Sequence, residues 1–399
     1  MEDILTGGAD RGPAWRRRGL LAAVVVLVAG IVVLRHLPGD QHRAASRALP
    51  GIVVSEPRPQ ALPGRAGVPG GVSGSRLWLM RGVQLPVSGP RPLWFWPATG
   101  RAEPISGLPV TGGLYSFVRA PGGWVVMRGA LARPQCKICM GAPLAVYFLA
   151  DNASRARWVG VAGAAAPAAS ARRLWLTSDR QGDDPGHAVI TAREVEANGH
   201  PVGPGVRLPA EYVIEGATVR GLLLAPAAPR GGPTAFLLWN PRAGQTDRRL
   251  GPVLAVSARH IAWLPRCARR CAVEVVDTVT GRVITVRQPT GQVAVRAMFS
   301  PDEGYLAVQV GPNFAGTGSG EATRLDVVSL STGQVEPVPG TRASRGALVA
   351  FGWPDDNDTL VAELAFPAEV RLSAWHPGAE RPDVVALEPG PGAADLVLG

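Results

Sequence analysis

Residues 273–286 read VEVVDTVTGRVITV, which is an apolar strand, a short turn rich in Thr and Gly, and a second apolar strand. The same unit recurs along the chain, and its turn is marked successively by Gly100, Asn152, Gly199, Gly244, Gly281, Gly333 and Gly378. These markers are on average about 46 residues apart, which is the length of one four-stranded propeller blade. Further strand pairs lie between the hairpins, for example in residues 116–128 and 297–310. The repeat therefore predicts an all-β fold in which each blade consists of two consecutive hairpins.

Seven turn markers over residues 76–399 predict one propeller of seven four-stranded blades, with six or eight blades as the alternatives. A β-sandwich also consists of short strands and regular turns, but it does not explain seven copies of one hairpin. The composition agrees with short strands, because 50 Gly and 38 Pro make up about 22% of the 399 residues and break helices repeatedly. We expect residues 395–398 to pair with the first blade and to close the ring.

Residues 299–307, FSPDEGYLA, resemble the F-S-P-D-G-x-x-L-A turn of Tol-type, WD-repeat-like bacterial propellers. Residues 352–356, GWPDD, are a degenerate second copy, and residues 277–282, DTVTGR, are typical of a blade turn. Glu303 interrupts the Asp-Gly pair of the family pattern. The resemblance implies a propeller that binds partners. It implies no catalytic residue, because these motifs form turns.

The N-terminal region contains an uncharged apolar run, GLLAAVVVLVAGIVVL, at residues 19–34. A membrane span needs about 20 apolar residues, so this run is slightly short. Its basic flanks, Arg16, Arg17, Arg18 and Arg35, can anchor it at the two interfaces. The alternative is a cleaved signal peptide, but no small-residue cleavage site follows the run closely. The sequence predicts a cytoplasmic tail over 1–18, a transmembrane signal anchor over 19–35, a Pro/Gly/Arg-rich linker over 36–75 and the propeller over 76–399.

The cysteines form two close pairs, Cys136 with Cys139 and Cys267 with Cys271. The basic residues before the apolar run narrowly favour a cytoplasmic N-terminus, which leaves the propeller outside the cytoplasm. Paired cysteines in that location are normally disulfides, so we expect two local disulfides that hold loops. A shared zinc ion or a redox-active dithiol is the alternative. A shared metal is disfavoured because the pairs fall in blades on nearly opposite sides of the expected ring.

Few residues point to chemistry. Asp355, Asp356 and Asp358 form a dense oxygen cluster that is a weak candidate for calcium, although a strand-connecting turn explains it equally well. The sequence has no G-x-S-x-G nucleophile motif and no phosphate-binding loop of the Walker type. We therefore expect no catalytic residue and no cofactor. Tryptophans recur at equivalent positions of the repeat, for example Trp94 and Trp239, which favours packing between blades over ligand stacking.

Charge is unevenly distributed: residues 77–300 carry a net charge of +14 and residues 301–399 carry −9, within a total of +10. Such polarity favours docking of a partner of complementary charge. We expect a single-pass plasma-membrane protein whose extracytoplasmic propeller acts as a protein-interaction or scaffold module in a bacterial cell envelope. Anionic lipid and cell-wall polymers are further candidate partners, whereas nucleic acid is not. The alternative is a propeller enzyme of lyase or glycan hydrolase type with its site at the central channel.

Overall fold

The structure is a computed structural model that describes residues 79–81, 83–88, 91–109, 113–130, 143–180, 189–210, 212–226, 235–265, 271–312, 323–341, 347–354, 358–366, 369–387 and 398. Within these ranges the regular elements are all strands. No helix in the described ranges is long and apolar enough to span a membrane. The predicted anchor, its flanking arginines and the linker lie outside these ranges, as does the N-terminal tail.

The strands form seven antiparallel sheets, which we number as blades in chain order. Blade 1 consists of β1 (Leu85–Val87), β2 (Leu93–Trp96) and β3 (Arg101–Pro104). Blade 2 consists of β4 (Gly113–Ala120), β5 (Gly123–Ala130), β6 (Leu144–Ala150) and β7 (Arg157–Ala162). Blade 3 consists of β8 (Ala164–Pro167), β9 (Arg173–Arg180), β10 (Val189–Glu196) and β11 (Val206–Arg207). Blade 4 consists of β12 (Tyr212–Thr218), β13 (Gly221–Pro226), β14 (Phe236–Asn240) and β15 (Gln245–Leu250).

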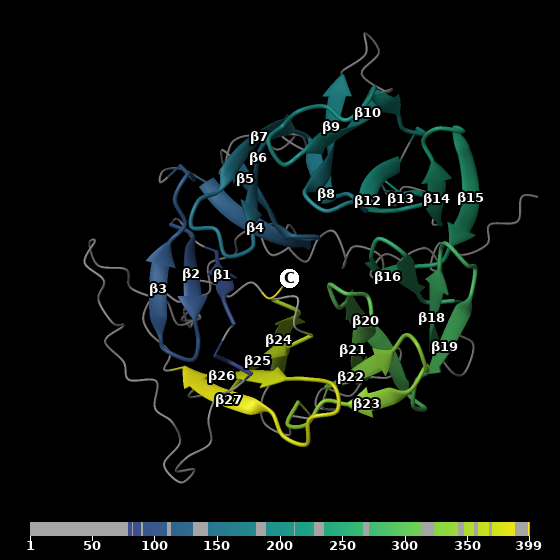
Figure 1. The fold of residues 1–399 in the computed structure, drawn as a ribbon. Coiled ribbons are helices and arrows are strands. Elements are labelled where there is room, and N and C mark those ends of the chain that lie inside the picture. Colours follow the sequence, from purple (N-terminus) through teal and green to yellow (C-terminus); the bar gives the residue numbers. More distant parts are fainter. Residues whose placement is uncertain are drawn as a thin grey trace, which may run out of the picture. The chain divides into compact units, whose positions relative to one another are not determined.

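The remaining blades repeat the same meander. Blade 5 consists of β16 (Val253–Val256), β17 (His260–Trp263), β18 (Ala272–Asp277) and β19 (Val283–Arg287). Blade 6 consists of β20 (Gln292–Phe299), β21 (Tyr305–Pro312), β22 (Arg324–Ser329) and β23 (Val335–Pro337). Blade 7 consists of β24 (Ala347–Gly352), β25 (Leu360–Ala365), β26 (Val370–Trp375) and β27 (Asp383–Leu387). Figure 1 shows the sheets following one another around a ring in chain order, with strands such as β4, β16 and β20 nearest its centre. The predicted propeller of seven blades is confirmed.

The turn between the last two described strands repeats in every blade and explains why the repeat can be recognised in the sequence. All seven turn markers have positive φ, from 59° at Asn152 to 87° at Gly199. Glycine adopts this left-handed conformation without steric cost, and asparagine tolerates it better than most residues. A local backbone requirement therefore produces the repeat that the sequence displays.

Seven clusters of buried hydrophobic side chains fill the seven junctions between neighbouring blades. At one junction, Val273 of β18 lies in the same cluster as Leu306 of β21, and both side chains are 0% exposed. Alternate residues of a strand point to opposite sheet faces, so each blade packs against both of its neighbours. The predicted role of the tryptophans is confirmed for Trp94 and Trp239, which are 2% and 5% exposed and lie in two of these clusters.

The cluster between blades 7 and 1 contains Leu398, which is 2% exposed and packs with Leu85 of β1 and Leu372 of β26. The chain end therefore lies where the first and last blades meet. Blade 1 has three described strands, whereas the other six blades have four. The predicted pairing of residues 395–398 stays a prediction, because residues 395–397 lie outside the described ranges.

Candidate functional site

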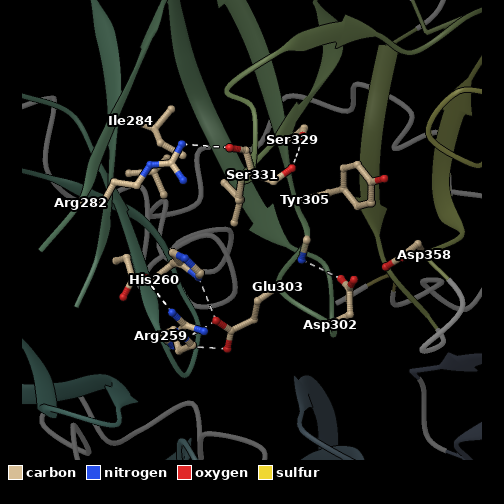
Figure 2. Close-up of a pocket in the computed structure, with 14 residues that line it drawn as sticks. Arg259, His260, Arg282, Ile284, Asp302, Glu303, Tyr305, Ser329, Ser331 and Asp358 are labelled. Carbon is tan, nitrogen blue, oxygen red and sulfur yellow. Dashed lines mark hydrogen bonds and ion pairs between the residues drawn. The ribbon is translucent and has the colours of Figure 1, made fainter. Parts of the chain in front are cut away.

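A hollow of about 390 Å³ lies where blade 5 meets blade 6. It opens on the face formed by the turns between first and second strands and between third and fourth strands, which we call the turn face. Figure 2 shows the residues that line it, with charged side chains contributed from both blades and Asp358 contributed from the connection between β24 and β25. The hollow therefore joins turn residues of three consecutive blades.

Asp302 organises the turn between β20 and β21, which is the segment that resembles the Tol-type motif. Its Oδ1 accepts hydrogen bonds from Ser300 Oγ at 2.5 Å and from the Gly304 backbone N–H at 2.8 Å. Burial by itself raises the pKa of Asp302, but its hydrogen bonds with Ser300, Gly304 and Asp358 outweigh this effect, and the pKa is lowered. The residues of this motif thus stabilise a turn, as the resemblance implied.

Glu303 links this turn to blade 5. Its carboxylate accepts a hydrogen bond from the Arg259 backbone N–H at 3.1 Å and contacts His260 Nδ1 at 2.9 Å. Its backbone has a φ of 59°, a left-handed conformation that costs a non-glycine residue about 1 kcal/mol. The glycine expected from the family pattern would remove that strain but could not reach blade 5. The departure from the motif therefore supplies an inter-blade contact.

Asp277 holds the opposite side of the hollow, in the turn between β18 and β19. Its Oδ1 accepts from the backbone N–H groups of Val279 and Thr280 at 2.8 and 3.1 Å, and Arg259 Nη2 donates to its Oδ2 at 2.7 Å. Burial opposes ionisation, but these hydrogen bonds prevail and lower the pKa of Asp277 to about 2. Asp277 is therefore ionised under all physiological conditions.

The third side of the hollow comes from β19 and the turn after β22. Arg282 Nη2 donates to the Ser331 backbone oxygen at 2.9 Å, and the hydroxyls of Ser329 and Ser331 lie 3.0 Å apart. The Tyr305 ring is stacked on Trp353 of the next blade, with ring centroids 6.4 Å apart. The Arg282 and Tyr305 contacts again run from one blade to the next.

Asp277 and Asp302 serve this hollow as hydrogen-bond acceptors. Asp277 and Asp302 have lowered pKa values, whereas a general acid or base works best with a pKa near the working pH. The described residues hold no group of three or more His, Cys, Asp or Glu side chains that could bind a metal ion. Two of the four described non-glycine residues with positive φ, Glu303 and Asp358, line this one hollow. Strained residues concentrate at binding and switch sites, which makes the hollow a candidate for partner contact.

The inner strands carry two half-buried charged residues, Glu215 and Arg296. Glu215 sits at an irregularity in the β12–β13 pairing, and burial raises the pKa of its carboxyl. Arg296 follows a similar irregularity in β20, and burial lowers the pKa of its guanidinium. These residues are the described groups closest in kind to what the enzyme alternative requires.

Most of the predicted site residues lie outside the described ranges. This holds for Asp355 and Asp356, for Cys136, Cys139 and Cys267, and for the membrane-flanking arginines. Asp358 is described and lies beside Asp302 rather than in a described metal cluster. Cys271 is buried at 7% exposure and is disulfide-bonded. Its expected pairing with Cys267, and the calcium site, stay predictions.

The structure also brings together residues that the sequence did not single out as a site. The last residue before the second strand is an exposed arginine in three consecutive blades, namely Arg172, Arg220 and Arg259. Exposed arginines in the neighbouring turns of blades 4 and 5 extend this set. We call the complete set the arginine row: Arg172, Arg220, Arg242, Arg259 and Arg282. The signal was present in the sequence, but it becomes visible only when the turns are aligned blade by blade.

The arginine row keeps most of its charge available. Within the described part of the chain, Arg172 and Arg242 have no carboxylate within ion-pair distance, and Arg220 and Arg282 donate to backbone carbonyls. The acidic turn of blade 6 differs, because Asp302 and Glu303 already accept hydrogen bonds from the protein itself. The basic and the acidic blades therefore differ in the sign of their charge and also in how many of their charged side chains are free to contact a partner.

No family model matches the sequence, and no curated protein matches it either. Among solved structures, the chain is similar to TolB from Acinetobacter baumannii, with 11% identity and a TM-score of 0.41 over 77% of this chain and 64% of that one. It is also similar to an oligogalacturonate lyase from Vibrio parahaemolyticus, with 8% identity and a TM-score of 0.45 over 77% and 87% of the two chains.

An acylaminoacyl peptidase from Pyrococcus horikoshii is a further similar structure, with 12% identity and a TM-score of 0.48. The match covers 73% of this chain and 47% of the peptidase, so the chain spans about half of that protein's length. Because all three TM-scores lie below 0.5, the propeller fold rests on the chain's own strand pairing and blade packing.

Proposed function

We propose that this chain is a membrane-anchored propeller that acts outside the cytoplasm of a bacterial cell as a protein-interaction or scaffold module. The anchor is the apolar run at residues 19–34 with its basic flanks. The interaction surface is the turn face of blades 3 to 5, where the arginine row lies. The partner is a protein with an acidic surface patch.

The availability of the arginine row carries this proposal. Arg172 and Arg242 are exposed and have no carboxylate partner in the described part of the chain, so their guanidinium donors are open to a partner. Guanidinium groups bind carboxylates in a bidentate geometry, which gives orientation as well as affinity. Exposed charges of one sign also raise the rate of association with an oppositely charged surface, and salt weakens this effect.

The test is a pull-down of tagged full-length protein from detergent-solubilised membranes at low and high salt. The variant R172E/R242E reverses two arginines of the row that have no carboxylate partner among the described residues. The matched control, R207E/R249E, makes the same charge change at exposed arginines of the outer strands β11 and β15. We expect a partner that high salt releases, that the row variant loses and that the control retains. Equal capture by both variants would remove the arginine row from the proposal.

The membrane topology is tested separately. A protease added to intact spheroplasts should digest the propeller, and full protection would overturn the proposed orientation. Mass-tag labelling without reductant should detect no free thiol if both cysteine pairs form disulfides.

A second candidate is the propeller enzyme of lyase or glycan hydrolase type. The observation that favours it is Glu215, an inner-strand carboxyl whose pKa is raised by burial, as a general acid requires. The substitution Glu215→Gln distinguishes the two functions. If the chain is a scaffold, this variant should still bind its partner with the same salt dependence. If the chain is an enzyme, this variant should still bind its glycan but no longer convert it.

A further inference from the structure

Trp158 is an outlier among the tryptophans of the propeller. It is 51% exposed, whereas Trp94, Trp124 and Trp375 are at most 2% exposed and lie between blades. Trp158 lies on β7, the outermost strand of blade 2, and contacts the Tyr147 ring at a centroid distance of 5.2 Å with an interplanar angle of 75°. A large aromatic ring that is held in place yet left in solvent is available to stack on a ligand.

A second hollow, of about 460 Å³, adjoins this ring at the junction of blades 1 and 2. It is lined by Trp158, Arg155 and Arg157, together with the small residues Gly107 and Ala156. Its size is within the range of small-ligand sites, which is roughly 300–1,000 Å³. The small residues leave the space that the three large side chains border.

Backbone contacts keep this hollow in shape. Ser106 N–H donates to the Ser154 oxygen, and Ala156 N–H donates to the Ser106 oxygen, both at 2.9 Å. Gly107 has a φ of +80°, and a Cβ added there would lie 2.3 Å from the Ala156 oxygen. Only glycine lets this segment lie so close to the start of β7, and the same absence of a side chain keeps the hollow open.

Among the described residues, nothing compensates the positive charge of the hollow. Arg155 and Arg157 are both exposed, and within the described part of the chain neither has an ion pair or a stacked ring. Two guanidinium groups and one free aromatic face thus border the same space, with no carboxylate among the lining residues. A ligand that fits must offer a flat apolar face to the ring and a carboxylate to the arginines.

We propose that this hollow binds an acidic polysaccharide, with one sugar ring stacked on Trp158 and its carboxylate held by Arg155 and Arg157. A pyranose ring offers a face of C–H groups for stacking and, in a uronic acid, a carboxylate at its edge. An acidic peptide could bind the two arginines, but its carboxylate side chains have no flat face to stack on the Trp158 ring. The site shares no residue with the arginine row, so it goes beyond the proposed function and stands or falls independently of it.

The test measures binding to the full-length protein in detergent by calorimetry and by tryptophan fluorescence. The probes are hexagalacturonate as the acidic sugar, maltohexaose as the neutral sugar and hexaglutamate as the acidic peptide. We expect binding of hexagalacturonate with a change in fluorescence, and binding at least about tenfold weaker for the other two probes.

Variants assign the site. W158A should abolish the fluorescence change and weaken binding about tenfold or more, and W158F should retain most of the affinity because the ring remains. R155A/R157A should weaken binding by a similar factor, and the control R207A/R249A should leave it within about twofold. No binding of hexagalacturonate, equal binding of hexaglutamate, or binding that W158A leaves unchanged would each overturn the proposal. Because Trp158 and both arginines are exposed, these substitutions leave the inter-blade cores intact.

Discussion

Replacing Glu303 by glycine or by alanine separates two opposing effects at one position. The carboxylate accepts from Arg259 N–H and contacts His260 Nδ1, and both replacements remove these contacts. The backbone φ of 59° is strained for glutamate and for alanine but not for glycine. The comparison therefore measures the inter-blade contact and the strain independently.

The expected loss of unfolding free energy follows from the burial of this contact and from the backbone conformation of Glu303. The side chains of Glu303 and His260 are 16% and 12% exposed, so water replaces the lost contacts only in part. We assign the contacts about 2–3 kcal/mol in total and the strain about 1 kcal/mol. Glu303→Gly should thus lower the free energy of unfolding by about 1–2 kcal/mol, and Glu303→Ala by about 2–3 kcal/mol. For a domain of this size each kcal/mol corresponds to roughly 2 °C in Tm.

The assay is thermal and urea unfolding of the full-length protein in detergent, followed by tryptophan fluorescence. Glu380 provides the matched control, because it is an exposed turn residue of blade 7 without a positive φ. There we expect alanine to be at least as stable as glycine, the reverse of the order at Glu303. A Glu303→Ala variant as stable as Glu303→Gly, or a glycine variant as stable as the wild type, would contradict the roles assigned to the contact and the strain.

Three further predictions concern stability. Asp277→Asn should lower the free energy of unfolding by roughly 1–2 kcal/mol at pH 7. Because the pKa of Asp277 is lowered to about 2, this contribution is present above the unfolded-state pKa and should vanish as the pH falls from about 4 to about 2. Urea titrations of both proteins across that pH range will show or contradict this loss. Gly107→Ala should lower the free energy of unfolding by about 2–4 kcal/mol, because its Cβ would lie 2.3 Å from the Ala156 oxygen. Gly281→Ala has a φ of +76° but open space around its Cβ, so it should lower the free energy of unfolding by only about 1 kcal/mol. Equal losses of stability in the two variants would contradict the steric clash at Gly107. Leu398→Ala should cost about 2–3 kcal/mol and make blade 1 more sensitive to limited proteolysis, and an unchanged digestion pattern would show that the chain end does not hold the ring.

The sequence predicted the fold through features that are local in the chain. A left-handed turn residue, such as Gly281, and alternating apolar residues on either side are readable within about fifteen positions. The period between such hairpins then indicates a propeller, because each blade is one uninterrupted meander. The same logic explains why the FSPDEG segment was correctly assigned to a turn.

The candidate sites required contacts that cross from blade to blade. His260 and Glu303 are 43 residues apart in the chain, and nothing in the spacing of either motif predicts that they meet. Glu303 was visible only as a departure from the family pattern, and His260 gave no signal. The reason for both is the same: the register between neighbouring blades, which no single repeat contains, decides which turn residues face each other.

The all-β class, the seven-fold repeat and the positions of the turns between the last two described strands of each blade are readable from the sequence, because they depend on backbone conformation and side-chain alternation within each hairpin. Which charged side chains are paired within the protein and which stay available to a partner depends on contacts between blades. Asp302 and Glu303 are occupied by hydrogen bonds, while Arg172 and Arg242 are open to solvent. Likewise, packing between blades buries most of the described tryptophans and leaves Trp158 at the rim. The composition gives the number of charged and aromatic residues, but whether such a side chain can bind a partner depends on the residues that the fold places beside it.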